Sequence, residues 1–263
     1  MKLVYILFSG LIFFSCSPKM RTGVSTELRV MSYNIHHANP PSRPDVIDLQ
    51  AVANVIKNAR PDIVALQEVD VHTTRSGKDI NQAEELGKLT GMTAYFAHAI
   101  DYGGGEYGVA ILSRFPMSEK NNIPLPTKES TKGEHRTLGK VTVTISGGKQ
   151  VVVAFTHLDA QRTDTNRVLQ MSRITELLAS EKRPVIIAGD LNAMAGTPVI
   201  DMLDKQFTRS CTSNCAFTIP QVNPNKTIDF IAFSPAAAFK VVSHEVIVEE
   251  YASDHRPVLT VLK

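Results

Sequence analysis

Several apolar runs of this sequence end abruptly in side chains that can bind a cation, transfer a proton or orient an anion. These positions are Asn34, Glu68, His157, Asp190, Asn192, Asp229, Asp254 and His255. A protein core could not hold such groups unpaired, so their place at the ends of apolar runs predicts a common polar edge. Separated carboxylates and amides suit the hard divalent cations Mg²⁺ or Mn²⁺ better than zinc.

Three other catalytic signatures are missing from the sequence. There is no His-Glu-x-x-His zinc motif and no Gly-x-Ser-x-Gly nucleophile elbow. The stretch Gly-Gly-Lys-Gln at 147–150 lacks the spacing and the hydroxyl of a phosphate-binding loop. The pattern therefore favours chemistry assisted by a hard divalent cation.

Alternating strands and helices would position these groups. Strands are predicted over 27–35, 62–69, 94–99, 107–113, 141–145, 151–155, 184–189, 227–233, 241–248 and 257–262. Helices are predicted from an Asp45 cap to Ile56, over 81–89 and over 165–179. No long linker or repeat interrupts them, so residues 27–263 are predicted to form one mixed α/β domain.

The composition is that of an ordinary folded protein. The chain has 263 residues, 43% of them hydrophobic and 21% charged, and a formal net charge of +2. These values exclude intrinsic disorder, a collagen-like repeat and a disulfide-dense miniprotein. The small net charge argues against a strongly electrostatic partner such as DNA or an anionic membrane, because such partners favour a clear basic excess.

The first residues are predicted to be an export sequence. The apolar run 3–14 is shorter than the roughly 20 residues that a membrane-spanning helix needs, so it is typical of a signal peptide. Ser15-Cys16 resembles a bacterial lipobox, with cleavage after residue 15, lipidation of Cys16 and a tether over 16–26. We therefore expect an envelope lipoprotein anchored by its N-terminal lipid, facing the periplasm or on the outer membrane. The alternative is an ordinary secretory signal with an incidental cysteine.

Two cysteines remain besides the lipidated Cys16. Cys211 and Cys215 lie four positions apart. In an oxidising compartment an isolated pair most simply forms a small-loop disulfide. A zinc site is the weaker alternative, because no second cysteine pair or close histidine pair accompanies these two.

A series of short motifs, each at the end of a predicted strand, resembles the endonuclease/exonuclease/phosphatase superfamily. The motifs are Ser-Tyr-Asn34, Leu-Gln-Glu68, Tyr107-Gly-Val-Ala-Ile-Leu-Ser, Thr-His157-Leu-Asp, Gly-Asp190-Leu-Asn192, Thr-Ile-Asp229 and Ser-Asp254-His255. The resemblance covers residue 28 to the C terminus. It implies a four-layer α-β-β-α sandwich of the DNase I-like type, with a metal-dependent phosphohydrolase site at one rim.

The resemblance also implies which residues hold the metal. Glu68 matches the principal ligand of a Mg²⁺ or Mn²⁺ ion, and Asn34 lies beside it at the metal or at a phosphate oxygen. Asp254 matches an acidic neighbour near the metal.

Five further residues match catalytic positions of the family. Asp190 would orient or deprotonate the attacking water. His157 and Asn192 would bind phosphate oxygens and stabilise charge on phosphorus. Asp229 and His255 would form an Asp-His pair.

Four residues are candidates for substrate contact. Tyr107 and Arg136 could instead be a packed ring and a solvated charge. His36 and His37 follow Asn34 directly, so a substrate or a metal role is open for both.

The function that we expect is hydrolysis of a phosphoester in a small molecule or a lipid headgroup, by a monomer. An exported nuclease is the second hypothesis, because Arg43, Arg75, Lys78, Arg114, Arg136 and Arg162 could line a rim. A catalytically inactive envelope binding protein is the third.

Overall fold

The computed structural model describes residues 27–263, which form two six-stranded β-sheets. The predicted signal peptide, the tether and Cys16 lie outside the described residues. The first sheet has the order β11-β12-β1-β2-β4-β3 and the second β5-β6-β7-β8-β10-β9. The strands of the first are β1 (Leu28–Asn34), β2 (Ile63–Val71), β3 (Thr93–Tyr102), β4 (Gly105–Ser113), β11 (Val241–Val246) and β12 (Val258–Leu262). Those of the second are β5 (Met117–Pro124), β6 (Thr137–Thr144), β7 (Gln150–His157), β8 (Val185–Asp190), β9 (Thr208–Arg209) and β10 (Asp229–Phe233).

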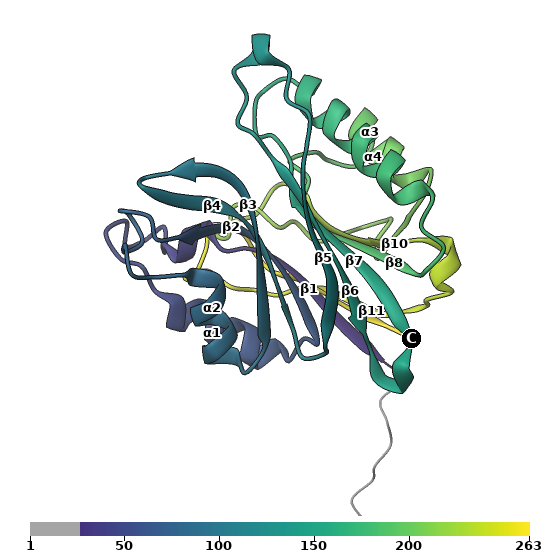
Figure 1. The fold of residues 1–263 in the computed structure, drawn as a ribbon, viewed down its shortest axis with the longest axis horizontal. Helices are drawn as coiled ribbons and strands as arrows, with labels where there is room; N and C mark the ends of the chain where they lie inside the picture. The colour runs from purple at the N-terminus through teal and green to yellow at the C-terminus, as the bar shows by residue number, and fades with distance from the viewer. Residues whose placement is uncertain (1–26) are drawn as a thin grey trace, which may run out of the picture.

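The two sheets pack face to face with helices on both outer sides (Figure 1). Helices α1 (Leu49–Ala59) and α2 (Gln82–Thr90) cover the first sheet, and α3 (Thr165–Ala179) and α4 (Pro198–Asp204) cover the second. One apolar cluster fills the space between the sheets, and one lies under each helix pair. The expected four-layer α-β-β-α sandwich of the DNase I-like type is therefore confirmed.

A parallel strand pair lies at the centre of each sheet. β1 runs parallel to β2, and β7 runs parallel to β8, whereas the other pairings are antiparallel. The crossovers contain α1 and α3, which lets both strands of each pair end at the same edge. Since Asp229 opens β10 directly opposite Asp190 at the end of β8, the polar residues at these strand ends gather at one rim.

Helix α1 begins later than the sequence predicts. Its N-cap is Asp48, whose Oδ1 accepts a hydrogen bond from Ala51 N at 2.9 Å. The predicted cap, Asp45, lies in an exposed turn closed by Val46 N donating to Arg43 O at 3.0 Å. The prediction of Asp45 as the cap was wrong because this turn uses the backbone that the helix would need.

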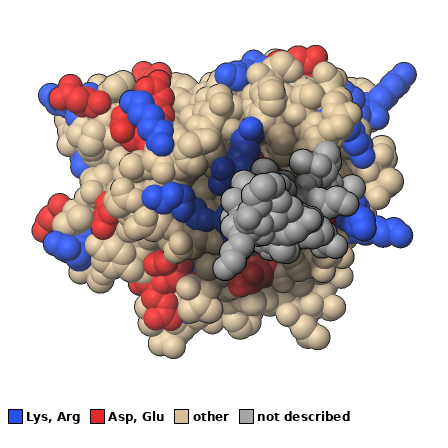
Figure 2. All heavy atoms as spheres, turned by 90° about the horizontal axis from the view of Figure 1, so that it is seen from below, with Lys and Arg blue, Asp and Glu red and all other residues tan. Residues whose placement is uncertain are grey.

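Charges of both signs are interspersed on the surface. Figure 2 shows one face, where Lys and Arg lie among Asp and Glu. Some arginines form ion pairs with acidic side chains, as Arg183 does with both Glu119 and Glu181. Within residues 27–263, no helix is long and apolar enough to cross a bilayer.

Candidate active site

Glu68 leaves the regular pairing of its strand. The register between β2 and β4 shifts between Leu66 and Val69, and Glu68 adopts a left-handed φ of 57°. A bulge of this kind redirects one side chain of a strand, and here it presents the Glu68 carboxylate to the rim.

Asn34, the last residue of β1, joins the two halves of the site. Its Nδ2 donates to Glu68 Oε1 at 3.0 Å and to Asp190 Oδ2 at 3.2 Å. Its Oδ1 accepts a hydrogen bond from His36 N at 3.0 Å. Two carboxylates on one side and a backbone donor on the other fix which way the amide faces.

Asp190, Asp229 and His255 form a buried group at the facing strand ends. His255 Nδ1 lies 2.9 Å from Asp229 Oδ2, and its Nε2 lies 3.7 Å from Asp190 Oδ2. Burial opposes the charge of His255, but the charge and hydrogen bond of Asp229 outweigh it and raise the His255 pKa to about 10. Burial and the charge of Asp229 raise the pKa of Asp190 well above that of an ordinary aspartate.

His157, at the end of β7, meets a donor at each ring nitrogen. Its Nδ1 lies 3.3 Å from Arg136 Nη1 and its Nε2 lies 3.0 Å from Asn192 Nδ2, and both partners can only donate. Burial and the charge of Arg136 lower the pKa of His157 well below its ordinary value, so the ring is neutral. Nε2 also lies 3.4 Å from Asp190 Oδ2, which can accept a proton carried on that nitrogen.

Asn192 lies just beyond β8 in a left-handed conformation with φ 47°. Its N donates to Asp190 Oδ1 at 2.9 Å, and its Nδ2 donates to Leu158 O at 3.0 Å and lies 3.0 Å from His157 Nε2. The side chains of Asn192 and His157 thus form a pair of polar groups beside the Asp190 carboxylate.

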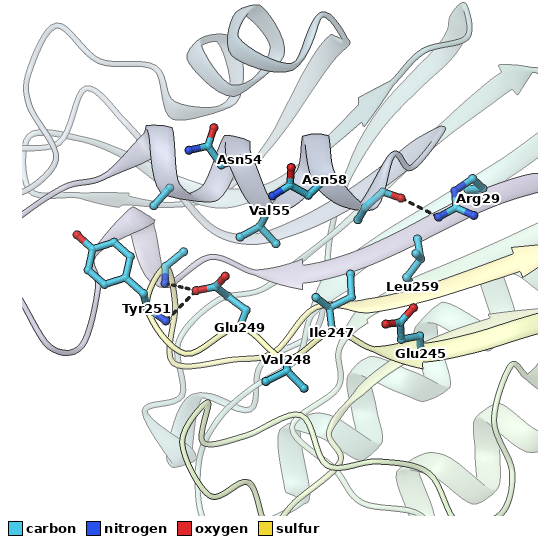
Figure 3. A pocket seen from close by; sticks show the side chains of 13 residues that line it. Arg29, Asn54, Val55, Asn58, Glu245, Ile247, Val248, Glu249, Tyr251 and Leu259 are labelled. Carbon is cyan, nitrogen blue, oxygen red and sulfur yellow. Dashed lines mark hydrogen bonds between the residues drawn. The ribbon is translucent and has the colours of Figure 1, made fainter.

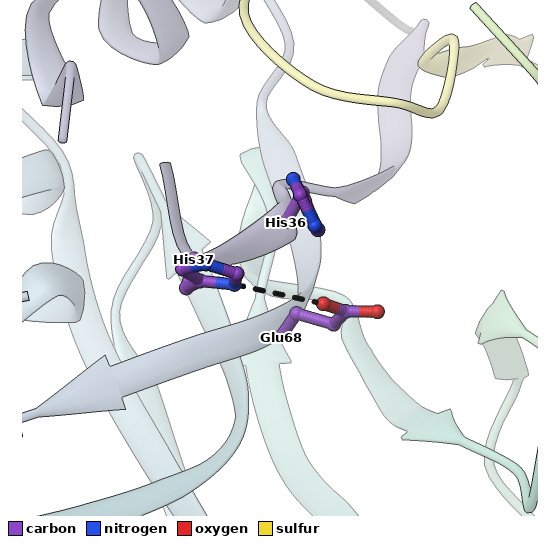
Figure 4. A group of neighbouring side chains, drawn as sticks. All are labelled: His36, His37 and Glu68. Atoms are coloured by element: carbon purple, nitrogen blue, oxygen red, sulfur yellow. Dashed lines mark ion pairs between the residues drawn. The ribbon is translucent and has the colours of Figure 1, made fainter. Parts of the chain in front are cut away.

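A second group of candidate metal ligands lies around Glu68. One ring nitrogen each of His36 and His37 and one Glu68 carboxylate oxygen lie within 4.8 Å of one another, and Figure 4 shows both rings beside this carboxylate. Burial opposes ionisation of Glu68, but His37, His157 and the Asn34 amide together hold its pKa well below the usual range. Asp254 lies in none of the three groups of candidate metal ligands among the described residues; its charge supports the raised pKa of His255.

The remaining predicted contacts lie next to these groups. Arg136 is 6% exposed and pairs with Glu134 Oε1 at 2.8 Å. Tyr107 is also buried, and burial together with the charge of Glu68 raises the pKa of its hydroxyl, so the phenol is neutral. Beyond it lies the exposed Tyr102 ring, 6.2 Å from the Tyr107 ring.

Two residues of the site had no predicted role. Ser253 Oγ donates to Asn34 O at 2.7 Å and accepts from His255 N at 3.2 Å, so it ties the β12 loop to β1. Glu134 neutralises Arg136. Ser253 could have been predicted because it lies inside the Ser-Asp-His motif. Glu134 lies in no motif that would have indicated its role.

Other concave and cysteine-containing regions lie apart from this site. A groove of about 560 Å³ runs between α1 and the β11–β12 connection, as Figure 3 shows, and contains none of the predicted site residues. Cys211 and Cys215 form a disulfide with a Cα–Cα distance of 5.8 Å. Among the described residues, neither sulfur belongs to any of the three groups of candidate metal ligands.

Two packed sheets with carboxylates, histidines and amides at one rim define a hydrolase of the α-β-β-α class. The model of the Endonuclease/Exonuclease/phosphatase family matches residues 31–255, and the chain belongs to this family. Its members hydrolyse phosphoester bonds and generally use divalent metal ions.

Three similar proteins cover different shares of the chain. A 5'-tyrosyl-DNA phosphodiesterase of Caenorhabditis briggsae is 31% identical over 63% of this chain, which spans only 44% of that relative. The uncharacterized protein YbhP of Escherichia coli is 26% identical over 87% of this chain and 93% of its own length. The crystal structure of an endonuclease/exonuclease/phosphatase from Beutenbergia cavernae has a TM-score of 0.74 and 25% identity, and the match covers 90% of this chain and 71% of that one.

Proposed function

We propose that this protein hydrolyses the phosphoester bond of a small molecule or a lipid headgroup by in-line attack of water. The observation that carries the proposal is the Asn34 amide, which links Glu68 of the first sheet to Asp190 of the second. A cation ligand and a proton acceptor are thereby held beside one another, as a hydrolytic phosphoryl transfer requires.

The Glu68 group and the buried Asp190, Asp229 and His255 group divide the chemistry between them. A divalent cation at Glu68, for which the sequence favours Mg²⁺ or Mn²⁺, would polarise a phosphoryl oxygen and stabilise the leaving oxygen. Asp190 takes the proton of the attacking water, because His255 with its pKa of about 10 is already protonated near neutral pH. The His255 cation then stabilises negative charge that develops on the phosphoryl group.

His157 and Asn192 contribute hydrogen-bond donors. In this proposal the neutral His157 carries its proton on Nε2, beside the Asp190 carboxylate and away from the Arg136 donor. Asn192 Nδ2, 3.0 Å from that nitrogen, supplies an amide donor at the same position. Donors fixed before the reaction begins lose little energy to reorientation, which suits them to phosphoryl oxygens that gain charge.

Three of the six basic residues that could line a rim are engaged elsewhere, which supports a small substrate over nucleic acid. Arg136 is buried and paired with Glu134, and Arg75 pairs with Asp70 Oδ2 at 2.7 Å. Arg114 lies at the other end of β4, where its Nε donates to Pro61 O at 2.9 Å. Phosphate tracking along a strand needs several unpaired cations, and these three do not supply it.

We also propose that the protein is exported and anchored through Cys16. The Cys211–Cys215 disulfide supports this, since such bonds persist in oxidising compartments. Membrane fractionation of cells that express the wild type and Cys16→Ser tests it: the variant should leave the membrane fraction, and equal retention of both would contradict the anchor.

A substrate panel tests the enzymatic proposal. Purified protein with Mg²⁺ or Mn²⁺ is assayed on bis-p-nitrophenyl phosphate, lipid phosphodiesters, inositol phosphates and DNA, each with a chelator control. We expect turnover of at least one small or lipid phosphoester and none after chelation. Turnover of DNA alone would overturn the small-substrate assignment in favour of the nuclease, and no turnover of any substrate would overturn the enzymatic proposal.

A further inference from the structure

The turn after β1 brings two imidazoles to the free side of Glu68. Residues 36–38 all adopt left-handed φ values, 47°, 44° and 58°. Non-glycine residues rarely adopt this conformation, and three in a row cost backbone energy that other contacts must offset. The turn sets both histidine rings beside one carboxylate.

The two Glu68 oxygens have different surroundings. Oε1 accepts a hydrogen bond from Asn34 Nδ2 at 3.0 Å, whereas Oε2 lies 3.9 Å from His37 Nδ1. Because the Asn34 oxygen is occupied by His36 N, the amide faces Glu68 as a donor and not as an oxygen ligand. A cation bound to Glu68 Oε2 would therefore have a histidine nitrogen as its next protein ligand.

His36 is prepared to offer a lone pair. Its Nδ1 lies 2.8 Å from Asn39 O, and since a carbonyl only accepts, this nitrogen carries the proton. The lone pair is then on Nε2. Histidines that bind metals commonly donate their other N–H to a backbone carbonyl in this way, which fixes the tautomer and orients the ring.

His37 offers the second nitrogen. Its Nδ1 is buried and has no hydrogen-bond partner among the described residues. A buried polar atom without a partner is rare in folded proteins and calls for an explanation such as an ion. The facing Glu68 oxygen makes a cation the group that both atoms would share.

We propose that His36, His37 and Glu68 bind the cation together, and that this site selects a first-row transition ion over Mg²⁺. The affinity of a site with nitrogen ligands for first-row transition ions rises from Mn²⁺ through Fe²⁺ and Co²⁺, whereas Mg²⁺ prefers oxygen ligands. The inference rests on the proposed metal-dependent hydrolysis and narrows the identity of its metal.

Metal binding to the full mature chain tests this inference without any substrate. Chelator-treated protein is titrated calorimetrically with Mn²⁺ and with Mg²⁺, for the wild type and for the double variant His36→Asn, His37→Asn. Asparagine tolerates left-handed φ, so these replacements keep the turn. We expect Mn²⁺ affinity to fall on the order of tenfold or more, as for lost metal-site groups, with Mg²⁺ affinity unchanged.

Two additional measurements keep the result interpretable. The matched control is His98→Gln, which removes the imidazole of the His98, Asp101 and Glu106 group and should leave Mn²⁺ affinity unchanged. Pulsed electron paramagnetic resonance of Mn²⁺ bound to the wild type should show coupling to ¹⁴N, with no variant required. Binding of Mn²⁺ without nitrogen coupling, or equal Mn²⁺ affinity in the double variant, would overturn the inference. A failure of the hydrolase proposal would instead appear as strong, nitrogen-coupled Mn²⁺ binding without turnover.

Discussion

The side-chain amide of Asn34 donates to Asp190 Oδ2 at 3.2 Å, although these residues lie 156 positions apart and in different sheets. The same amide holds Glu68, and Ser253 ties the Asn34 carbonyl to the loop that carries His255. One residue at the end of β1 thus sets the positions of the cation ligand, the proton acceptor and the histidine loop relative to one another.

The pH dependence of hydrolysis should depend on Asp229. Asp190 accepts a proton only when ionised, so activity falls as the pH drops through its raised pKa, above the value near 4 of an ordinary aspartate. The His255 cation is lost as the pH rises through its pKa of about 10. Asp229→Asn removes the charge that raises both values, and we expect the whole profile of kcat/KM to move to lower pH. If the acidic and alkaline limbs of the kcat/KM profile stayed at their wild-type pH in Asp229→Asn, the roles assigned to Asp190 and His255 would be contradicted.

The tautomer of His157 should depend on Arg136. Arg136→Met removes the donor that faces Nδ1 and leaves the Asn192 donor that faces Nε2, so the proton should shift toward Nδ1 and kcat should fall about 10²-fold, the low end of the effect of a lost transition-state donor. Arg136→Gln, which keeps a donor, should retain more activity. ¹⁵N NMR of the imidazole checks the cause: only the Met variant should lose the Nε2–H form. An unchanged tautomer in that variant would argue against this positioning role.

The buried Asp70 should stabilise the β2–α2 connection. It is fully buried and accepts hydrogen bonds from Arg75 Nε, Ser76 Oγ and Thr73 Oγ1 at 2.7, 2.6 and 2.8 Å. Asp70→Asn should lower the free energy of unfolding by about 2 kcal/mol, measured by urea denaturation at pH 7. Glu85→Gln, which breaks only the exposed pair with Lys88, is the control and should change little.

Low pH should remove the difference in the free energy of unfolding between the wild type and Asp70→Asn. Burial opposes the Asp70 charge, but hydrogen bonds from Arg75 and Ser76 outweigh it and lower its pKa. The Asp70 carboxylate contributes fully to the free energy of unfolding above the pKa near 4 of an aspartate in the unfolded chain. This contribution is lost as the pH falls through the lower pKa of Asp70 in the folded protein. A difference that stays constant down to acid unfolding would exclude the carboxylate as its source.

Elements that are buried on one or both faces could be predicted from the sequence. β8 is buried at all six positions and α3 buries a face that includes Met171, Ile174 and Leu178, and both follow the predicted ranges closely. β5 was missed because six of its eight residues are exposed and polar residues dominate it. α4 spans only seven residues and β9 two, which is too short for a periodic pattern to be recognised.

The residues of the site were easier to predict than their states. The ends of apolar runs identified Glu68 and Asp190, although Glu68 lies at a bulge inside β2. The sequence could not show which way the Asn34 amide faces or that Arg136 contacts His157. These depend on contacts between strands of different sheets. The choice between Asp190 and His255 as proton acceptor likewise depends on the burial and charge that the fold creates around them.

Rates of metal-dependent hydrolysis by Glu68→Ala and His255→Ala test the central claim most directly. Both variants are compared with the wild type and with His98→Gln on the best substrate of the panel, after thermal unfolding has shown that all are folded. The account predicts that each variant loses on the order of 10²-fold or more in kcat, while His98→Gln keeps its rate. Near-wild-type turnover by either variant, or turnover that a chelator does not abolish, would contradict it.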